Sequence, residues 1–404
     1  MSRYRSRLCE IVPILGLVAA LAFAQVAVAP AAALAQQPVV IGGAISHTGR
    51  YSEPAGRLRD GRLLWEEEVN ARGGLLGRPV KLIMRDDRSD PATSVKLYER
   101  LLTEENVDLC LGAYSSPITE AIASITERYK CPIVADGAAT RSIWEKGRKY
   151  IFGLVGPSDD YLRGAVEIAA KHGYKRIAVI NEDSLFSKAA AAGAERYAKQ
   201  HGMEVVLREE YPRTATDFRP LLLKIKALNA DVIAGASYFV DAAALTRQMK
   251  ELNIVPKIWA ATVGPGLPRF TEDLGPLAEY VMGATQWEPV PALGYPGIKE
   301  FIERFEKRFG YKPNYHAAGG YAAMLILEEA VKRAGKIDRD AIREQLAKLD
   351  MTTHYGRFKV DEIGFNSGKG LLLFQILEGK RRLVWPDESR EVAPVVPFPA
   401  WEKR

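Results

Sequence analysis

Hydroxyl side chains stand where a predicted strand gives way to a predicted helix, in the segment GAYSSPITEA (residues 112–121). An apolar run over residues 107–111 comes first, Ser115 and Ser116 follow it, and Pro117 fits the first turn of a helix. The first N–H groups of a helix have no partner within it, and the helix dipole favours negative charge beside them. The segment could therefore bind a small anion. Both serines could equally be N-caps that bind no ligand.

A similar arrangement recurs in CPIVADGAAT (residues 131–140), where a short apolar strand is followed by small residues and Thr140. Parallel strands that are neighbours in a sheet end at the same edge, and ligands bind beyond that edge. The side chains and backbone groups expected around one small anionic group are those of Ser115, Ser116, Ala138 and Thr140.

Motifs of catalysis and of cofactor binding do not occur in the chain. Ser237 lies in GASYF, which lacks the second glycine of G-x-S-x-G, and neither a P-loop nor G-x-G-x-x-G is present. The five histidines are scattered without the spacing of metal ligands. Asp86 and Asp87 are explained more simply as turn residues that bond to nearby backbone. We therefore expect no enzymatic activity, no cofactor and no metal site.

Aromatic residues follow three of the strands predicted after residue 155. Phe186 comes after residues 176–181, Tyr238 after residues 231–236 and Trp287 after residues 280–286. Because ligands of open α/β sheets lie beyond the carboxyl ends of the strands, these rings could form the wall of a pocket. Ordinary packing in loops or between lobes is the alternative.

Strand-like and helix-like segments alternate along the chain in the β-α-β order of a mostly parallel sheet flanked by helices. One such series precedes residue 155 and a second follows it, and the helices after residue 298 have too few strands to form a third domain. We therefore predict an α/β protein of two lobes joined by three crossovers. The N-terminal lobe would comprise residues 38–155 and 286–353, the C-terminal lobe residues 156–285 and 354–385, with an irregular tail at 386–404.

The first 35 residues have the pattern of a secretory signal peptide. Arg3, Arg5 and Arg7 precede an apolar, alanine-rich stretch over residues 11–32, and Ala-Leu-Ala ending at Ala35 fits a cleavage site. The stretch is also long enough for a membrane span. We favour export to the periplasm with cleavage after Ala35.

Charge and length exclude some classes of function. The chain has 404 residues with 56 Lys and Arg against 50 Asp and Glu, a net charge of +6. The charges are interspersed, without a basic block interleaved with aromatic residues, so nucleic-acid binding is not expected. The length suits two domains that each bury a core.

Two cysteines, Cys110 and Cys131, remain after the predicted signal peptide. An exported protein can join such a pair in a disulfide. Both residues lie on or beside predicted buried strands, however, where an unbonded cysteine packs as a small apolar residue. We expect free thiols.

Several segments together resemble a known family. They are IGGAISHTGRYSEPAGRLRDG, NARGGLLGRPVKLIMRDDRSDP, LGAYSSPITEA and VADGAAT, with DVIAGASYFVDAAALTRQMKE and GRFKVDEIGF further on. They are similar to the periplasmic branched-chain amino-acid-binding proteins, the solute receptors of ABC importers of the leucine/isoleucine/valine type. The resemblance covers essentially the whole chain after the signal peptide. It implies a two-lobed type I periplasmic binding protein fold with a three-stranded hinge, and a ligand trapped in the cleft by rigid-body closure.

The resemblance also implies roles for single residues. Ser116, Ala138 and Thr140 fall where the family binds the carboxylate of its ligand. Phe186 falls at an aromatic position that covers the ligand, and Tyr238 at a contact in the second lobe. Ser115 remains closer to a helix cap.

One position departs from the family pattern. Where amino-acid binders place an acidic residue for the ligand's ammonium group, this chain has Thr262, in WAATVGPGLP. A buried ammonium needs a charged partner. Either another acid such as Asp241 or Glu53 takes this part, or the ligand carries no ammonium group.

The sequence therefore predicts a monomeric periplasmic receptor that captures a small carboxylate-bearing ligand and delivers it to an ABC permease in the inner membrane. A branched-chain or other hydrophobic amino acid is one ligand class, and an aromatic or aliphatic carboxylate without an ammonium group is the other. A third possibility is a ligand sensor for a regulatory partner.

Overall fold

Parallel strands joined through helices form the first part of the chain. The computed structural model describes residues 37–404, so the predicted signal peptide and its cleavage site lie outside the described residues. β1 pairs in parallel with β2 on one side and β3 on the other, and β4 pairs with β5. The elements are β1 (Val39–Ile45), α1 (Ser52–Ala71), β2 (Val80–Asp86), α2 (Pro91–Thr103), β3 (Leu109–Cys110), α3 (Ser116–Arg128), β4 (Ile133–Ala135) and β5 (Ile151–Gly153).

A seven-stranded sheet forms the next part, with the strand order β14-β13-β10-β9-β8-β6-β7. The strands from β10 to β7 are parallel, and β13 and β14 are antiparallel to their neighbours. The elements are α4 (Arg163–Lys171), β6 (Arg176–Glu182), α5 (Leu185–Gln200), β7 (Glu204–Tyr211), α6 (Arg219–Ala227), β8 (Val232–Ala236), α7 (Phe239–Glu251), β9 (Ile258–Ala261), α8 (Pro268–Leu274), β10 (Met282–Thr285), β13 (Leu372–Leu377) and β14 (Lys380–Trp385).

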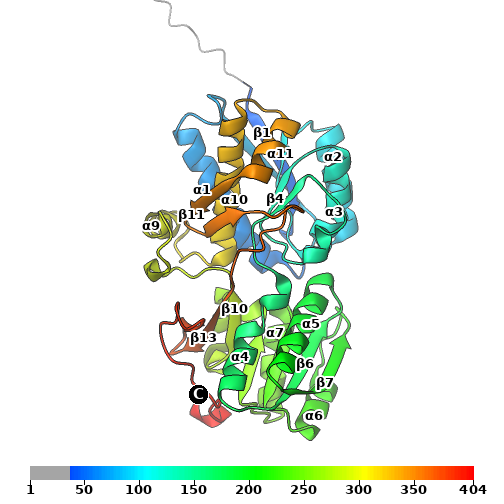
Figure 1. The fold of residues 1–404 in the computed structure, drawn as a ribbon, viewed down its shortest axis with the longest axis vertical. Coiled ribbons are helices and arrows are strands. Elements are labelled where there is room, and N and C mark those ends of the chain that lie inside the picture. Colours follow the sequence, from blue (N-terminus) through cyan, green and yellow to red (C-terminus); the bar gives the residue numbers. More distant parts are fainter. Residues whose placement is uncertain (1–36) are drawn as a thin grey trace, which may run out of the picture. The chain divides into compact units, whose positions relative to one another are not determined.

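Three late helices and a hairpin pack with the first group of strands (Figure 1). They are α9 (Ile298–Phe309), α10 (Tyr315–Ala334), α11 (Arg339–Lys348), β11 (Asp350–Thr353) and β12 (Gly356–Lys359). Glycines let α10 approach α1 closely, since a Cβ on Gly61 would lie 2.0 Å from the carbonyl oxygen of Ala317, and one on Gly320 would lie 2.2 Å from that of Leu58. Helix α10, although late in the sequence, thereby packs closely on α1 in the first part of the chain.

Residues 354–385 were expected in the C-terminal lobe, but β12, at the start of this range, pairs elsewhere. β12 forms an antiparallel hairpin with β11 and does not join the seven-stranded sheet, which takes up β13 and β14 instead. The turn at Gly356 has a φ of +113°, a conformation that glycine adopts readily, so the chain reverses at once and β12 returns along β11.

Two lobes can be distinguished within residues 38–404, which form one compact unit. We call β1–β5, α1–α3, α9–α11 and the β11–β12 hairpin the N-terminal lobe, and the seven-stranded sheet with α4–α8 the C-terminal lobe (Figure 1). Side chains join the segments that cross between them. Gln286 Oε1 accepts a 3.0 Å bond from the Gly156 N–H, and Asn366 Nδ2 donates to the Leu154 carbonyl at 3.3 Å. All three crossings therefore lie side by side.

Cys110 and Cys131 form a disulfide, so the expectation of free thiols was wrong. α3 returns the chain to a position where β4 lies beside the end of β3, and a bridge between Tyr114 and Gly137 continues this alignment. The two cysteines consequently face each other across adjacent strand ends, with their Cα atoms 5.9 Å apart. Sequence spacing did not reveal this neighbourhood, because it depends on where α3 returns the chain.

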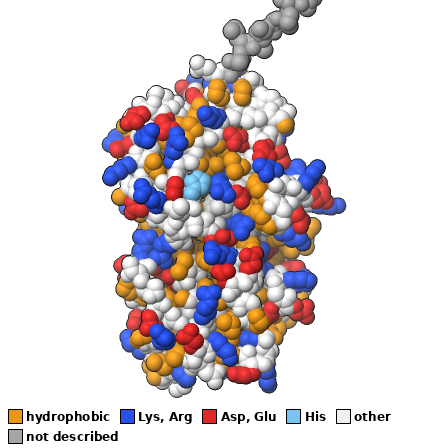
Figure 2. All heavy atoms as spheres, turned by 180° about the vertical axis from the view of Figure 1, so that it is seen from behind, with side chains coloured by type: hydrophobic (Ala, Val, Ile, Leu, Met, Phe, Trp, Pro, Cys, Tyr) orange, Lys and Arg blue, Asp and Glu red, His pale blue; other side chains and the backbone are white. Residues whose placement is uncertain are grey.

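Acidic and basic side chains are intermixed over the face drawn in Figure 2, as their distribution along the sequence predicts. Among the helices of residues 37–404, none combines the length and apolar character needed to cross a bilayer.

Candidate ligand-binding site

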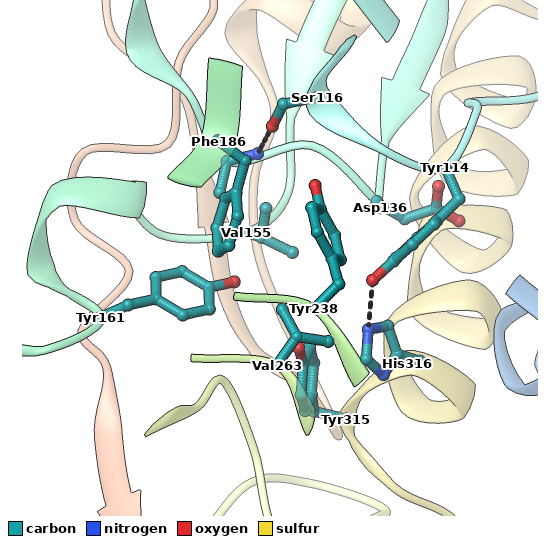
Figure 3. A pocket seen from close by; sticks show the side chains of 12 residues that line it. Tyr114, Ser116, Asp136, Val155, Tyr161, Phe186, Tyr238, Val263, Tyr315 and His316 are labelled. Carbon is teal, nitrogen blue, oxygen red and sulfur yellow. Dashed lines mark hydrogen bonds between the residues drawn. The ribbon is translucent and has the colours of Figure 1, made fainter. Parts of the chain in front are cut away.

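A small cavity lies at the N-terminus of α3, between the strand ends of the two lobes (Figure 3). The space that the centre of a water molecule can occupy in it is about 20 Å³. Both lobes contribute to its walls. The lining residues are Tyr114, Ser116, Asp136, Gly137, Ala139, Val155, Tyr161, Phe186, Tyr238, Val263, Tyr315 and His316.

Neither serine of the opening motif caps α3 with its side chain. Ser115 occupies the N-cap position but makes no capping bond, and its buried Oγ has no partner among residues 37–404. Ser116 Oγ accepts a 3.1 Å bond from the Ala139 N–H. A hydroxyl that accepts one bond can still donate its own proton, so Ser116 joins the two loops and keeps a donor for a ligand.

Two further buried hydroxyls belong to this end of the site. Within the described residues, Thr140 Oγ1 and the Tyr238 hydroxyl have no hydrogen-bond partner, although Thr140 is 3% and Tyr238 2% exposed. A buried polar group without a partner costs about 1–3 kcal/mol. A ligand with acceptor atoms at the N-terminus of α3 would remove this cost.

The structure brings most of the residues predicted for the site together, and places one elsewhere. Ser116, Phe186 and Tyr238 line the cavity. Ala138 lies between the lining residues 137 and 139, while Ser115 and Thr140 are buried beside lining residues without lining the cavity themselves.

Thr262 does not line the cavity, although its neighbour Val263 does. Its Oγ1 donates to the Ser237 carbonyl at 2.6 Å and accepts from the Ser237 N–H at 3.0 Å. Both functions of the hydroxyl are thus used to join the ends of β8 and β9. At the position where the family pattern has an acid for the ammonium group, this chain therefore has a hydroxyl that is bonded to backbone groups.

Half of the lining residues have aromatic rings. Phe186 contacts Tyr161 and Tyr238, with ring centroids 5.0 Å and 5.4 Å apart. Sequence reasoning missed Tyr161, Tyr315 and His316, because they follow no strand of the two predicted series. Asn314, the N-cap of α10, marks the start of the helix that carries the last two, but gives no sign of a ligand.

A buried ion pair lies directly behind the two loops. Arg62 Nη2 donates to Asp136 Oδ1 at 2.7 Å and to the Gly112 carbonyl at 2.9 Å, and neither charged side chain is exposed. Burial raises the pKa of Asp136, while the adjacent guanidinium opposes the shift. Arg62 therefore holds the roots of both loops together and neutralises Asp136.

The imidazole of His316 is uncharged at neutral pH. Burial lowers its pKa to about 3, and its Nε2 lies 3.3 Å from the Tyr114 hydroxyl (Figure 3). A ligand carboxylate would therefore rely on hydroxyls, backbone N–H groups and the α3 dipole.

The acids proposed as substitutes at position 262 do not line the cavity either. Glu53 pairs with Arg57 at 2.9 Å on α1, and Asp241 pairs with Arg50 at 3.0 Å. Among residues 37–404, no group of histidine, cysteine and carboxylate side chains could hold a metal ion.

A cavity enclosed by two α/β lobes that are joined at three crossings defines the class of two-lobed solute-binding proteins. The chain belongs to the periplasmic binding protein family, whose model matches residues 38–376. Leu/Ile/Val-binding protein homolog 7 of Brucella melitensis is 29% identical over 342 residues, covering 80% of this chain and 85% of that protein.

Solved structures have the same fold. A branched-chain amino acid transporter substrate-binding protein from Streptococcus pneumoniae, in complex with isoleucine, superposes with a TM-score of 0.78 at 20% identity, covering 87% of this chain and 100% of that one. A solute-binding protein of an ABC transporter from Rhodopseudomonas palustris, in complex with benzoate, gives 0.77 at 20% identity, covering 88% and 98%.

These findings confirm the resemblance to the branched-chain amino-acid-binding proteins and the type I periplasmic binding protein fold. The family consists of binding proteins, and its name implies the periplasm.

Proposed function

We propose that this protein is the periplasmic receptor of an ABC importer for a small carboxylate with a ring or apolar body and no ammonium group. The carrying observation is the cavity itself. Ser116 lines it at the N-terminus of α3, hydroxyls that have no partner within residues 37–404 lie in or beside its wall, and six of its twelve lining residues have aromatic rings. Ser116, Thr140 and the backbone around Ala138 would hold the carboxylate. Phe186 and Tyr238 would cover the body of the ligand.

The distribution of acids favours a ligand without an ammonium group. The Thr262 hydroxyl donates to the backbone carbonyl of Ser237. The carboxylate of Asp136, which lines the cavity, is neutralised by Arg62. A buried ammonium would enter a site whose charges are already balanced, and a buried charge without a partner is costly. A carboxylate meets N–H and O–H donors instead, which supports the second of the two ligand classes left open by the sequence.

Contacts from both lobes would make binding and closure one process. A ligand favours the closed form only as far as it binds that form better than the open one. Ser116 belongs to the N-terminal lobe and Tyr238 to the C-terminal lobe, so a ligand touching both supplies this difference. We propose that the two lobes move as rigid bodies about the three crossings. Their boundaries are those predicted above, except that the β11–β12 hairpin belongs to the N-terminal lobe.

Export after cleavage behind Ala35, a monomeric state and delivery to an inner-membrane permease complete the proposal. Turnover of the ligand is not expected, because the proposed site binds through hydrogen bonds and packing. Mass spectrometry of ligand recovered from the protein should find it unchanged.

Matched pairs of ligands test the proposal. Leucine and 4-methylpentanoate differ by the ammonium group alone, as do phenylalanine and 3-phenylpropanoate, and benzoate adds a shorter aromatic acid. At 100 times Kd a ligand stabilises the fold by about 2.7 kcal/mol, which a thermal-shift assay detects. We expect shifts from the acids without ammonium groups. Tighter binding of leucine or phenylalanine than of its partner would refute the proposed ligand class.

A further inference from the structure

Charged residues of both lobes meet beside the ligand cavity without lining it. Arg50, between β1 and α1 of the N-terminal lobe, places Nη2 2.8 Å from Glu182 Oε2 and 3.0 Å from Asp241 Oδ2. Glu182 ends β6 and Asp241 lies in the first turn of α7, both in the C-terminal lobe. One guanidinium thus bridges two carboxylates that lie 132 and 191 residues further along the chain.

In a second contact between the lobes, an arginine of the C-terminal lobe donates to a residue of the N-terminal lobe. Arg213 of the C-terminal lobe donates from Nη2 to the Tyr51 hydroxyl of the N-terminal lobe at 3.0 Å, and its Nε lies 3.2 Å from Glu182 Oε1. Arg50 also donates to the Arg213 carbonyl. The start of α1 is therefore held among three strand or helix ends of the other lobe.

Burial makes these contacts depend on closure. The side chain of Glu182 is fully buried, that of Asp241 is 3% exposed and that of Arg50 is 18% exposed. Separation of the lobes would withdraw Arg50 and return water to both carboxylates. Opening would therefore break ion pairs that the low local polarity of this structure strengthens.

We propose that Arg50, Glu182 and Asp241 form an inter-lobe clasp that sets how long the closed receptor holds its ligand, without contacting the ligand. The clasp rests on the proposed function only in requiring that the cleft opens and closes. Removing one partner of this buried charge pair should mainly raise the rate at which the ligand dissociates, because the ligand's encounter with the open form does not involve the pair.

Glu182 is the most deeply buried member of the clasp. Burial raises the pKa of its carboxyl, Arg50 and Arg213 oppose the shift, and the nearby carboxylate of Asp241 adds to it. The charged groups that face Glu182 are Arg50, Arg213 and Asp241, and the facing tyrosines are Tyr51, Tyr211 and Tyr238.

Arg50→Gln removes the clasp, and Arg57→Gln is the matched control. Arg57 lies on α1 with a similar exposure of 21%, but its partner Glu53 belongs to the same helix. Stopped-flow release of benzoate should be roughly 30-fold faster or more in Arg50→Gln, with the association rate little changed. Arg50→Lys should recover part of the loss, because a lysine keeps the charge but cannot bridge both carboxylates in the same geometry.

Small-angle scattering of the ligand-free protein gives a readout that needs no ligand. Arg50→Gln should increase the radius of gyration by shifting molecules to the open form, while Arg57→Gln should not. If benzoate fails to bind but Arg50→Gln still opens the ligand-free protein, the ligand proposal fails and the clasp stands. Wild-type release and a wild-type radius of gyration in Arg50→Gln would overturn the clasp.

Discussion

Replacing Ser116 with alanine removes one hydroxyl from the end of the cavity at the N-terminus of α3. In the structure this oxygen accepts a bond from the Ala139 N–H, so its own proton remains available to an anion. The variant therefore loses a donor to the ligand and an acceptor for the second loop. The backbone of α3 should persist, because the Ser116 side chain does not cap the helix.

The expected loss of affinity follows from the charge of the ligand. A hydrogen bond to a charged group contributes about 1.5–3 kcal/mol, against about 1 kcal/mol for a neutral pair. Kd should therefore rise roughly 10- to 150-fold, since each 1.4 kcal/mol is a factor of ten. For the methyl ester of the same acid, which carries no charge, the difference between wild type and variant should be much smaller.

Isothermal titration with benzoate or 3-phenylpropanoate measures the change. Ser124→Ala is the control, because Ser124 lies on the same helix, is exposed and bonds only to the Ala121 carbonyl. Its Kd should match that of the wild type. A Ser116→Ala variant that is folded and binds within threefold of the wild type would refute the carboxylate site at this position.

Two other changes test the surroundings of the site. Asp136→Asn leaves the Arg62 charge buried without its partner and should lower the free energy of unfolding by about 3–5 kcal/mol in urea titrations; a loss below 1 kcal/mol would contradict the pairing. Replacing Cys110 and Cys131 by alanine opens a crosslink that spans 21 residues and should cost about 3 kcal/mol by calorimetry, whereas unchanged stability would argue against the disulfide.

The alternation of strands and helices was sufficient to predict a mostly parallel α/β arrangement, because buried parallel strands are short apolar runs with clear ends. Pairings formed late in the chain were harder. Residues 356–359 were placed with the C-terminal lobe, whereas β12 pairs with β11, because the turn at Gly356 and not the composition of the strand decides its partner. The disulfide was missed for a related reason: Cys110 and Cys131 become neighbours only through the path of α3.

The residues of the site also differ in whether the sequence could predict them. Ser116 was predictable, because a hydroxyl at a strand end before a helix has a chemical meaning in the sequence itself. His316 was not, because it begins a helix that reaches the cavity only through the packing of α10 on α1. The part played by Thr262 depends on its bonds to Ser237, which no sequence pattern records.

The disulfide between Cys110 and Cys131 has a consequence for how binding energy is divided between the lobes. It joins the chain just before both carboxylate loops, and Arg62 ties the same loops a few residues further on. The N-terminal half of the site is thus preorganised, and a ligand need not spend affinity on ordering it. Discrimination among carboxylates would then depend on the contacts that form when the C-terminal lobe closes. Receptors with new specificities should therefore be obtained most readily by changing the aromatic residues of the C-terminal lobe.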